Sequence, residues 1–392
     1  MAAYPQAVQP GDAGTFTYAN PPRIHWGAGC LSERLEQELA ERRARRAFVI
    51  STRSVATNPE LGGRLADLLG TRCVGQFAAI GQHAPAAAVA EAARTAAAAS
   101  PDLLISFGGG SPIDATKAVA FSLATGLDLS QPTAAQQARA YTPGADRVLP
   151  HVAIPTTLSV AELSGLAGFT TEDAHEKVGL RGQALIPRAV IFDAELSLHT
   201  PLELWLSTGI RAVDHAVETL LAPGSHPFAD TLALEALRRL RAGLLATRAD
   251  PGDVAARTES QLGGWFSFTL PGPAAAGLSH TLGKRIGARH AIPHGVSSCL
   301  LLPHVMRYLA PRTAAAQARI AAALGVDVRK MPPEQAAACA ADAVVELIRQ
   351  LDLPRHLAAY GLTEADLEAA ARPVASDDWP LEDLIGIYRA AL

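Results

Sequence analysis

The chain has 392 residues, which at about 150 residues per domain is enough for two domains. Hydrophobic residues make up 49% of the chain and charged residues 18%, a balance that supports a packed core and excludes disorder. The formal net charge of −4 argues against a nucleic-acid-binding surface. Four cysteines form no CxxC pair, and no segment reads as a signal peptide or membrane span. We therefore expect a cytoplasmic globular protein with no nucleic-acid or membrane partner.

Short apolar runs alternate with Ala- and Leu-rich segments in the first half of the chain. The runs RAFVIS, CVGQFAAI, DLLISF, RVLPHVAIP and RAVIFD predict buried strands, and the longer segments predict helices. This order is typical of a parallel sheet with crossover helices. The segment GFTTEDAHEKVGL predicts a hairpin or loop, and the polar stretch 125–147 predicts an exposed excursion. We predict an α/β domain over residues 1–200.

The strand-like runs stop after Pro201. The segments ELWLSTGIRAVDHAVETLLA, HPFADTLALEALRRLRAGLLA and ARTESQLGGWFSF have the apolar spacing of helices, and amphipathic segments continue to the end of the chain. Breaks fall at MPP, DLP and RPVASDDWP. We predict an all-helical domain over residues 201–392.

The motif FGGGSPIDATKA (107–118) follows an apolar run and begins a helix. Glycines at such a turn let backbone amides approach a pyrophosphate, and the helix N-terminus favours an anion there. This reasoning selects Gly109 and Gly110 as anion-binding residues. Ser111 and Asp114 are expected to cap the first helical turn. The alternative is a flexible turn without a ligand.

A second strand, in IPTTLSVAE, ends in the hydroxyl side chains of Thr156, Thr157 and Ser159. Carboxyl ends of parallel strands share one edge of the sheet, where ligands bind in open α/β folds. These hydroxyls can therefore donate to a phosphate or a ribose, and the alternative is that they cap a helix. Lys177 can reach the same anion, or it is a solvated surface lysine.

Four of the twelve histidines fall in two short segments of the helical half: His215 in GIRAVDHAVE, and His280, His290 and His294 in GLSHTLGKRIGARHAIPHG. A glycine and a proline between His280 and His294 predict a broken helix, on whose converging segments the two imidazoles lie. A side chain that titrates near neutrality suits proton transfer. Core packing remains the alternative for each of them.

In this order, the motifs GGGSPIDATKA, PTT, GIRAVDHAVE and GLSHTLGKRIGARHAIPHG resemble the iron-containing alcohol dehydrogenase superfamily, and most closely its maleylacetate reductase branch. The resemblance runs from RIHWGAG (23–29) to the C-terminal helices. It implies a dinucleotide-binding domain, a helical catalytic domain with the active site in the cleft between them, and a homodimer.

The resemblance also implies the catalytic residues. Metal-dependent members hold iron or zinc with one aspartate and three histidines, and His215, His280 and His294 match the three histidines. Arg211 stands at the aspartate position, and Lys284 stands where a further family histidine lies. A guanidinium does not ligate a divalent cation, so we expect no bound metal. If a metal is bound, the three histidines are its expected ligands.

Arg211 is then expected to replace the metal as the fixed positive charge that stabilises a developing alkoxide, with Lys284 as a second cation. Its planar fork also favours a carboxylate on the substrate. The alternative is that Arg211 pairs with Asp214 or Glu218. Asp214 does not replace the missing ligand, because three residues further along it points roughly 60° away around the helix.

The cofactor implied by the resemblance is NAD(H) or NADP(H). Members that require NAD carry an acid after the strand that corresponds to FVIS, where this chain has Ser51, Thr52 and Arg53. Without that acid a 2′-phosphate is not repelled, so both cofactors stay open. The expected cofactor-binding residues are Thr52, Gly109, Gly110, Ser111, Asp114, Thr156, Thr157, Ser159, Lys177 and Ser197.

The leading interpretation is a nicotinamide-dependent reductase that transfers hydride to a small oxo-acid or ketone, as maleylacetate reductases do, without a metal. The alternatives are a metal-dependent (iron or zinc) alcohol dehydrogenase, a lyase with dehydroquinate-synthase architecture, and a cofactor-binding protein without catalysis. The expected partner is a small-molecule substrate that carries a carboxylate.

Overall fold

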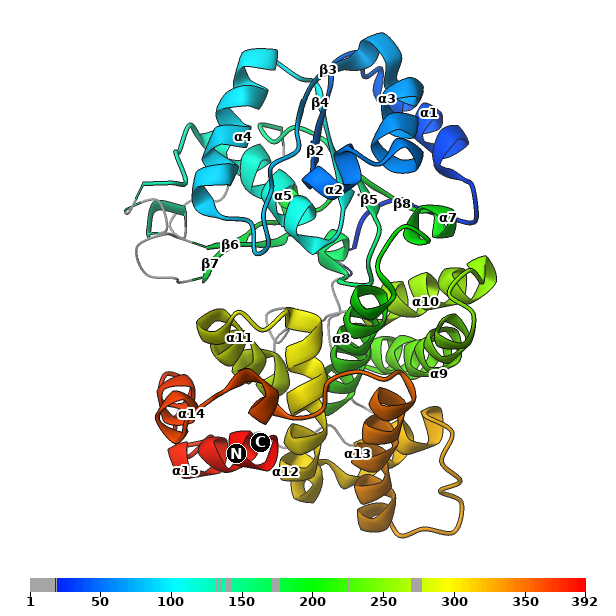
Figure 1. Cartoon of the computed structure of the whole chain (residues 1–392), viewed down its shortest axis with the longest axis vertical. Coiled ribbons are helices and arrows are strands. Elements are labelled where there is room, and N and C mark those ends of the chain that lie inside the picture. The colour runs from blue at the N-terminus through cyan, green and yellow to red at the C-terminus, as the bar shows by residue number, and fades with distance from the viewer. Residues whose placement is uncertain are drawn as a thin grey trace, which may run out of the picture. The chain divides into compact units, whose positions relative to one another are not determined.

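The computed structural model describes residues 18, 20–131, 133, 136–138, 143–144, 146–170, 177–223, 226–268 and 277–392. They form two compact units: Ala19–Thr200, and Pro201–Leu392 together with Tyr18. The first unit runs from blue to green in Figure 1 and the second from green to red. No helix among the described residues has the length and hydrophobicity needed to cross a membrane.

A parallel sheet of six described strands lies at the centre of the first unit, in the order β1-β8-β5-β4-β2-β3. The strands are β1 (Ile24–Trp26), β2 (Ala47–Ser51), β3 (Cys73–Phe77), β4 (Leu103–Gly108), β5 (His151–Pro155) and β8 (Ala189–Phe192). The parallel α/β fold predicted from the sequence is confirmed. β6 (Leu166–Thr170) and β7 (Lys177–Arg181) pair as an antiparallel hairpin in the segment GFTTEDAHEKVGL.

Helices cover both faces of this sheet. α1 (Leu31–Arg42) and α3 (Arg64–Leu69) lie on one face, and α4 (Ala86–Ala99) and α5 (Gly110–Thr125) lie on the other (Figure 1). Phe48 packs with the α4 and α5 side, whereas Val49 packs with the α1 and α3 side. Successive strand residues point to opposite faces, so a strand buried on both sides reads as a continuous apolar run.

Most described residues of the segment 125–147 are exposed, as the sequence predicts. The segment lies partly outside the described residues, and within the described part Leu129 and Ala138 are buried against the α4 and α5 core. Isolated apolar residues in a polar stretch are enough to hold it onto the domain.

The shorter elements of the first unit lie between these strands and helices. They are α2 (Arg53–Ala56), η1 (Pro59–Gly63), η2 (Gly70–Arg72), η3 (Ala161–Leu163), η4 (Gln183–Leu185) and α7 (Ala194–Ser197).

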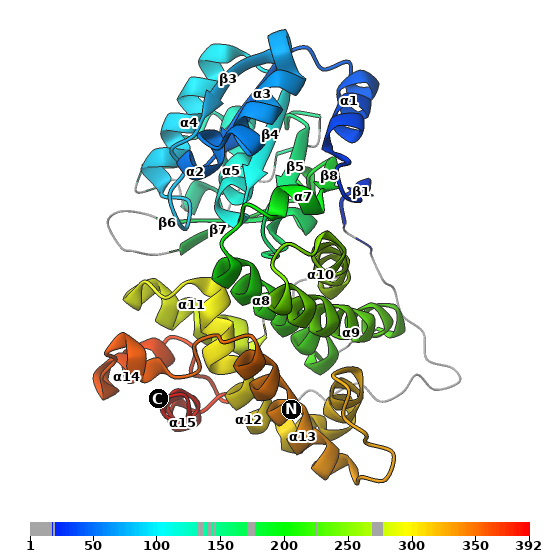
Figure 2. The same ribbon diagram turned by 45° about the vertical axis from the view of Figure 1, so that its right-hand side comes forward.

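The second unit is helical throughout its described residues, as the sequence predicts. Its elements are α8 (Leu202–Leu221), α9 (Pro227–Ala249), α10 (Val254–Ser267), α11 (Leu278–His290), α12 (His294–Ala323), α13 (Pro333–Gln350), η6 (Leu357–Tyr360), α14 (Glu364–Ala371) and α15 (Leu381–Ala390). α8 packs against α9, α10, α11 and α12 (Figure 2). The predicted break between His280 and His294 is present: Ala291 adopts φ 53° at the end of α11, and Pro293 precedes α12.

Candidate active site

The carboxyl edge of the sheet joins a glycine turn to a loop rich in hydroxyls. β4 ends at Gly108, whose φ of +136° favours glycine, and α5 begins two residues later. In the neighbouring strand β5, the N–H of Thr156 donates to the carbonyl of Gly108 over 2.9 Å. The loop from Thr156 to Gly165, here called the β5–β6 loop, therefore begins directly beside the glycine turn.

Two hydroxyls of this loop lie against the glycine turn with unused hydrogen-bonding capacity. Thr157 Oγ1 and Ser159 Oγ are buried and have no hydrogen-bond partner in the described part of the chain. A Cβ on Gly109 would lie 3.3 Å from Thr157 Oγ1, and one on Gly110 would lie 2.9 Å from Ser159 Oγ. The glycines thus keep open the space beside two orphan hydroxyls at a helix N-terminus, an arrangement that fits a dinucleotide pyrophosphate.

The predicted capping of α5 by Ser111 and Asp114 is wrong. Gly109 is the N-cap residue, and no side chain caps this helix. Ser111 Oγ instead accepts from the N–H of His83 over 3.1 Å, and Asp114 Oδ2 accepts from the N–H of Gly168 over 3.1 Å. Both side chains tie α5 to distant segments, which leaves the first amides of the helix for another acceptor.

The other predicted cofactor residues lie in varied surroundings. Thr52 is the N-cap residue of α2, and its hydroxyl lies 3.1 Å from that of Ser54. Ser197 is fully buried in α7 and donates to the carbonyl of Ala194 over 2.7 Å. Lys177 begins β7, and its side chain is outside the described part of the structure. Cofactor contact by these residues stays a prediction.

In the helical unit, two of the predicted histidines form a buried pair. His215 on α8 and His280 on α11 are 6% and 3% exposed, and their Nε2 atoms lie 3.3 Å apart. The ring of Phe268 meets that of His215 edge to face, with centroids 4.7 Å apart. Because the pair is buried away from water, the electrostatic interactions of neighbouring charges with these rings are stronger than they would be in solvent.

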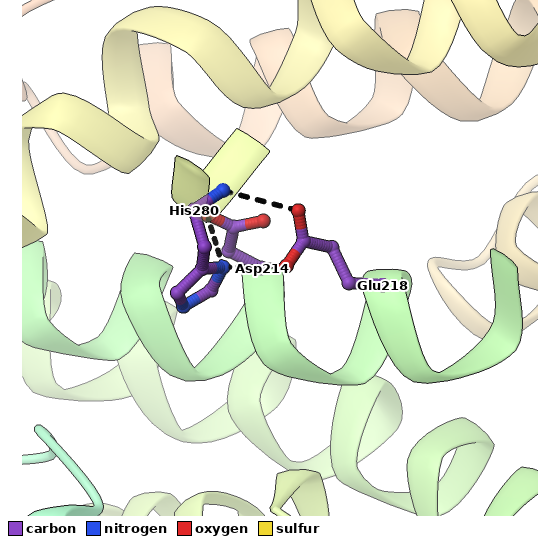
Figure 3. A group of neighbouring side chains, drawn as sticks. All are labelled: Asp214, Glu218 and His280. Atoms are coloured by element: carbon purple, nitrogen blue, oxygen red, sulfur yellow. Dashed lines mark hydrogen bonds and ion pairs between the residues drawn. The ribbon is translucent and has the colours of Figure 1, made fainter. Parts of the chain in front are cut away.

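Two carboxylates of α8 lie behind His280, as Figure 3 shows. Glu218 Oε2 is 2.6 Å from His280 Nδ1, and Asp214 Oδ2 is 3.4 Å from the same nitrogen. A carboxylate at Nδ1 directs the proton of that nitrogen toward itself and leaves Nε2 for the contact with His215. His280 thus faces carboxylates with one edge and His215 with the other.

The same carboxylates hold the first turn of α11. Glu218 accepts from the N–H of Gly277 over 2.9 Å and from the N–H of His280 over 3.1 Å, and Asp214 accepts from the hydroxyl of Ser279 over 2.9 Å. Glu218 therefore satisfies free amides at the N-terminus of a neighbouring helix. A Cβ on Gly277 would lie 2.5 Å from Glu218 Cδ, so the glycine makes room for the carboxylate.

The two imidazoles have opposite electrostatic surroundings. Burial and the positive charges of His280, Arg211 and Lys284 hold the pKa of His215 well below its usual value. Burial also lowers the pKa of His280, but Glu218 and Asp214 outweigh it, so that the net pKa is raised. We infer that His280 carries the proton of the pair and that His215 is neutral. The charges of Arg211 and Lys284 both act on His215, and a catalytic role of these two side chains stays a prediction.

The remaining histidines of the motif lie at the ends of helices. His294 is the first residue of α12, and its carbonyl accepts from the hydroxyl of Ser297. His290 lies at the end of α11, where its Nε2 is 3.6 Å from Asp366 Oδ1. A catalytic role of His294 stays a prediction, whereas the ring of His290 faces Asp366.

Comparison with known proteins identifies the family. Residues 21–194 match the family described as iron-containing alcohol dehydrogenase, and residues 205–386 match its C-terminal part. A maleylacetate reductase from Burkholderia cepacia is 31% identical over 362 residues, which cover 92% of this chain and 91% of that protein. The chain belongs to the iron-containing alcohol dehydrogenase family. It is therefore an NAD(P)H-dependent oxidoreductase, as predicted.

Other members of the family agree with this assignment. A lactaldehyde reductase from Escherichia coli K12 is 32% identical over 301 residues, which cover 74% of this chain and 77% of the relative. The solved structure of a maleylacetate reductase from Agrobacterium tumefaciens superposes with a TM-score of 0.80 at 27% identity, over 97% of this chain and 99% of that one. The predicted resemblance to the maleylacetate reductase branch is thereby confirmed.

The family implies a metal ion, and the residues at its ligand positions fit a divalent cation poorly. Arg211 occupies the aspartate position, and its charge and that of Lys284 act on His215. Asp214 does not lie outside the site, because its carboxylate is 3.4 Å from His280 Nδ1. Asp214, Glu218 and His280 offer ligand atoms within 4.8 Å of one another, a group that could hold a metal on the Nδ1 side. Absence of metal therefore stays a prediction.

Sequence reasoning named Asp214 and Glu218 only as possible partners of Arg211 and missed their contact with His280. Their spacing offered a signal, because residues four apart lie on one face of a helix. That face could be assigned to His280 only once the packing of α8 against α11 was known.

Proposed function

We propose that this oxidoreductase reduces a small oxo-acid of the maleylacetate class without a bound metal. One observation carries the proposal: a buried imidazole pair that is backed by two carboxylates and lies within reach of the charges of Arg211 and Lys284. The relatives named maleylacetate reductase support the substrate class.

In the proposed reaction a carbonyl carbon, or the carbon of an activated double bond, receives a hydride, and the other atom of that bond receives a proton. The bound nicotinamide supplies the hydride. His280 provides the proton from Nε2, while Glu218 and Asp214 keep its Nδ1 side occupied. Arg211 stabilises negative charge on the substrate, either on the developing alkoxide or on a carboxylate that it grips with two N–H groups.

For the cofactor, we propose that the pyrophosphate binds at the amides from Gly109 to Ser111 and to the hydroxyls of Thr157 and Ser159. The orphan hydroxyls and the uncapped helix support this placement. The remaining predicted positions, Thr52, Asp114, Thr156, Lys177 and Ser197, are proposed to surround the rest of the dinucleotide. NADPH is accepted as well as NADH, because exposed Arg53 follows the strand where an acid would repel a 2′-phosphate.

The test is net oxidation of NADH and NADPH with a panel of oxo-acids that carry one or two carboxylates, each compared with a matched ketone that lacks them. Protein prepared without chelator is analysed for metal in parallel. Turnover that prefers the acids, in metal-free protein, is the expected result. Stoichiometric iron or zinc would refute the metal-free part, and a preference for the uncharged ketones would refute the substrate class.

A metal-dependent alcohol dehydrogenase is the second candidate. The carboxylate and imidazole atoms of Asp214, Glu218 and His280 favour it, because they lie close enough together for one cation. Metal that co-purifies and restores activity after chelation would select this candidate.

We also propose that the protein is a homodimer, on the resemblance alone. Light scattering of the purified protein tests this state, and a monomer at micromolar concentration would contradict it.

A further inference from the structure

A charged lysine lies in the core of the dinucleotide-binding unit, where an apolar residue would be expected. Lys117, on α5, has 0% exposure. Its Nζ donates to two backbone carbonyls, that of Ala161 over 2.5 Å and that of Leu166 over 2.7 Å. Buried ammonium groups are costly unless they are hydrogen-bonded and paired, so this placement calls for an explanation beyond packing.

Two carboxylates accompany the lysine. Asp114 Oδ1, one helical turn earlier, lies 4.0 Å from Lys117 Nζ. Glu162, which is 1% exposed, lies in the sequence between the residues that provide the two carbonyls. Burial lowers the pKa of Lys117 to about 8, although both carboxylates oppose this shift. Burial raises the pKa of Glu162 to about 7, and Lys117 opposes that shift. The three side chains act on one another electrostatically where the β5–β6 loop meets α5.

The carbonyls that Lys117 holds flank the later half of that loop. Ala161 begins η3, and Leu166 begins β6, so the lysine fixes both ends of the segment 161–166 to α5. The earlier half of the loop carries Ser159, which lies with Ala161 beside Gly110: a Cβ on Gly110 would be 2.9 Å from Ser159 Oγ and 3.6 Å from Ala161 Cβ.

Helical geometry links this anchor to the anion-binding end of α5. Lys117 comes seven residues after Gly110, which is close to two turns, so both lie on the same face of α5. One face of the helix therefore presents the glycine turn at its start and, two turns later, the amine that holds the neighbouring loop in place.

We propose that Lys117 is a positioning residue for dinucleotide binding, which holds the β5–β6 loop against α5 so that the hydroxyls of Thr157 and Ser159 reach the pyrophosphate. This inference rests on the proposed function for the identity of the ligand. Lys117 itself does not contact the ligand. Its loss leaves two buried carbonyls without a donor, and the loop moves to hydrate them.

The experiment replaces the amine by a side chain of similar length, Lys117→Met, and measures the dissociation constants of NADH and NADPH by the fluorescence of the bound nicotinamide, without substrate. We expect both constants to rise at least tenfold. At saturating cofactor, kcat and the KM of the oxo-acid should stay within about twofold of the parent, because the helical unit is unchanged.

Ser122→Ala is the matched control. Ser122 lies on the same helix, and its hydroxyl also donates to a backbone carbonyl, that of Leu127, over 2.5 Å. This bond is remote from the glycine turn. The control should lose stability and keep the parent dissociation constants. A folded Lys117→Met protein that behaves like this control would overturn the proposal.

Hydrogen exchange of the amides of residues 156–166, in protein without cofactor, gives a second measurement. We expect at least tenfold faster exchange in Lys117→Met and unchanged exchange in Ser122→Ala. Should Lys117→Met fail to fold, Lys117→Gln takes its place, because the NH2 group of glutamine can still donate to a carbonyl. Cofactor binding and hydrogen exchange are then measured on this variant. A parent that binds neither cofactor would refute the proposed function, and exchange would then decide the role of Lys117 on its own.

Discussion

Glu218→Gln tests whether a carboxylate on α8 holds His280 in its working orientation. The carboxylate accepts from two backbone amides and lies 2.6 Å from His280 Nδ1. A glutamine has nearly the same shape but only one accepting oxygen. Its NH2 group would face an N–H donor in at least one of these contacts.

The expected loss follows from these three contacts. A hydrogen bond to a charged group contributes roughly 1.5–3 kcal/mol and a neutral one roughly 0.5–1.5 kcal/mol, so each weakened contact costs about 1 kcal/mol. The free energy of unfolding should therefore fall by about 3 kcal/mol. The weakened contact with His280 Nδ1 allows the imidazole to rotate. If this costs about 1.4 kcal/mol of transition-state stabilisation, kcat falls tenfold.

Urea unfolding and steady-state kinetics measure the two effects. Glu259→Gln is the control, because Glu259 pairs with Arg239 over 2.7 Å at a side chain that is 46% exposed. A surface ion pair contributes at most about 1 kcal/mol, and it is remote from the imidazole pair. Glu218→Gln with lowered stability but parent kcat would show that Glu218 only caps α11, and parent values for both would refute the reasoning altogether.

Three further predictions concern other residues. Gly110→Leu should raise the KM of the cofactor more than tenfold, because the new side chain fills the space beside Ser159 Oγ. An unchanged KM would contradict the proposal that the pyrophosphate binds at this turn. Arg211→Asp should bind iron or zinc where the parent binds none, as metal analysis and activity with each ion will show, and a parent that already holds stoichiometric metal contradicts it. Burial lowers the pKa of His151 to about 3. Below pH 6.5 this imidazole is therefore protonated in the unfolded chain but stays neutral in the native protein. Stability should fall by up to about 1.4 kcal/mol per pH unit between pH 6.5 and 4, and chemical unfolding of His151→Gln should lack this slope; equal slopes would contradict the prediction.

The order of strands and helices could be predicted from the sequence because it depends on local periodicity. Strands buried on both faces read as continuous apolar runs, and the break between α11 and α12 follows from Gly287 and Pro293. β1 was not predicted, since its three residues, Ile24–Trp26, are too few for a period, and their place beside β8 comes from pairing with a segment more than 160 residues away.

The candidate site was predictable only where the chemistry lies within one motif. The glycine turn belongs to this class. Ser111 and Asp114 could not be assigned, because their partners His83 and Gly168 come from other segments and compete successfully with the local caps. The contact of the two carboxylates with His280 could not be predicted either, since helical spacing shows which residues share a face but not which helix that face meets.

The contact between Gly277 and Glu218 makes the effect of a substitution at either position depend on the residue at the other. A Cβ at position 277 would lie 2.5 Å from Glu218 Cδ, while the backbone of Gly277 itself, with φ −69°, would accept any residue. Among the described residues, the atoms that a Cβ at this position would meet first all belong to Glu218. In a lineage that shortens or removes residue 218 first, position 277 becomes free to vary, whereas the reverse order passes through an intermediate with a steric clash. We therefore expect the outcome of changing both positions to depend on the order of the two substitutions.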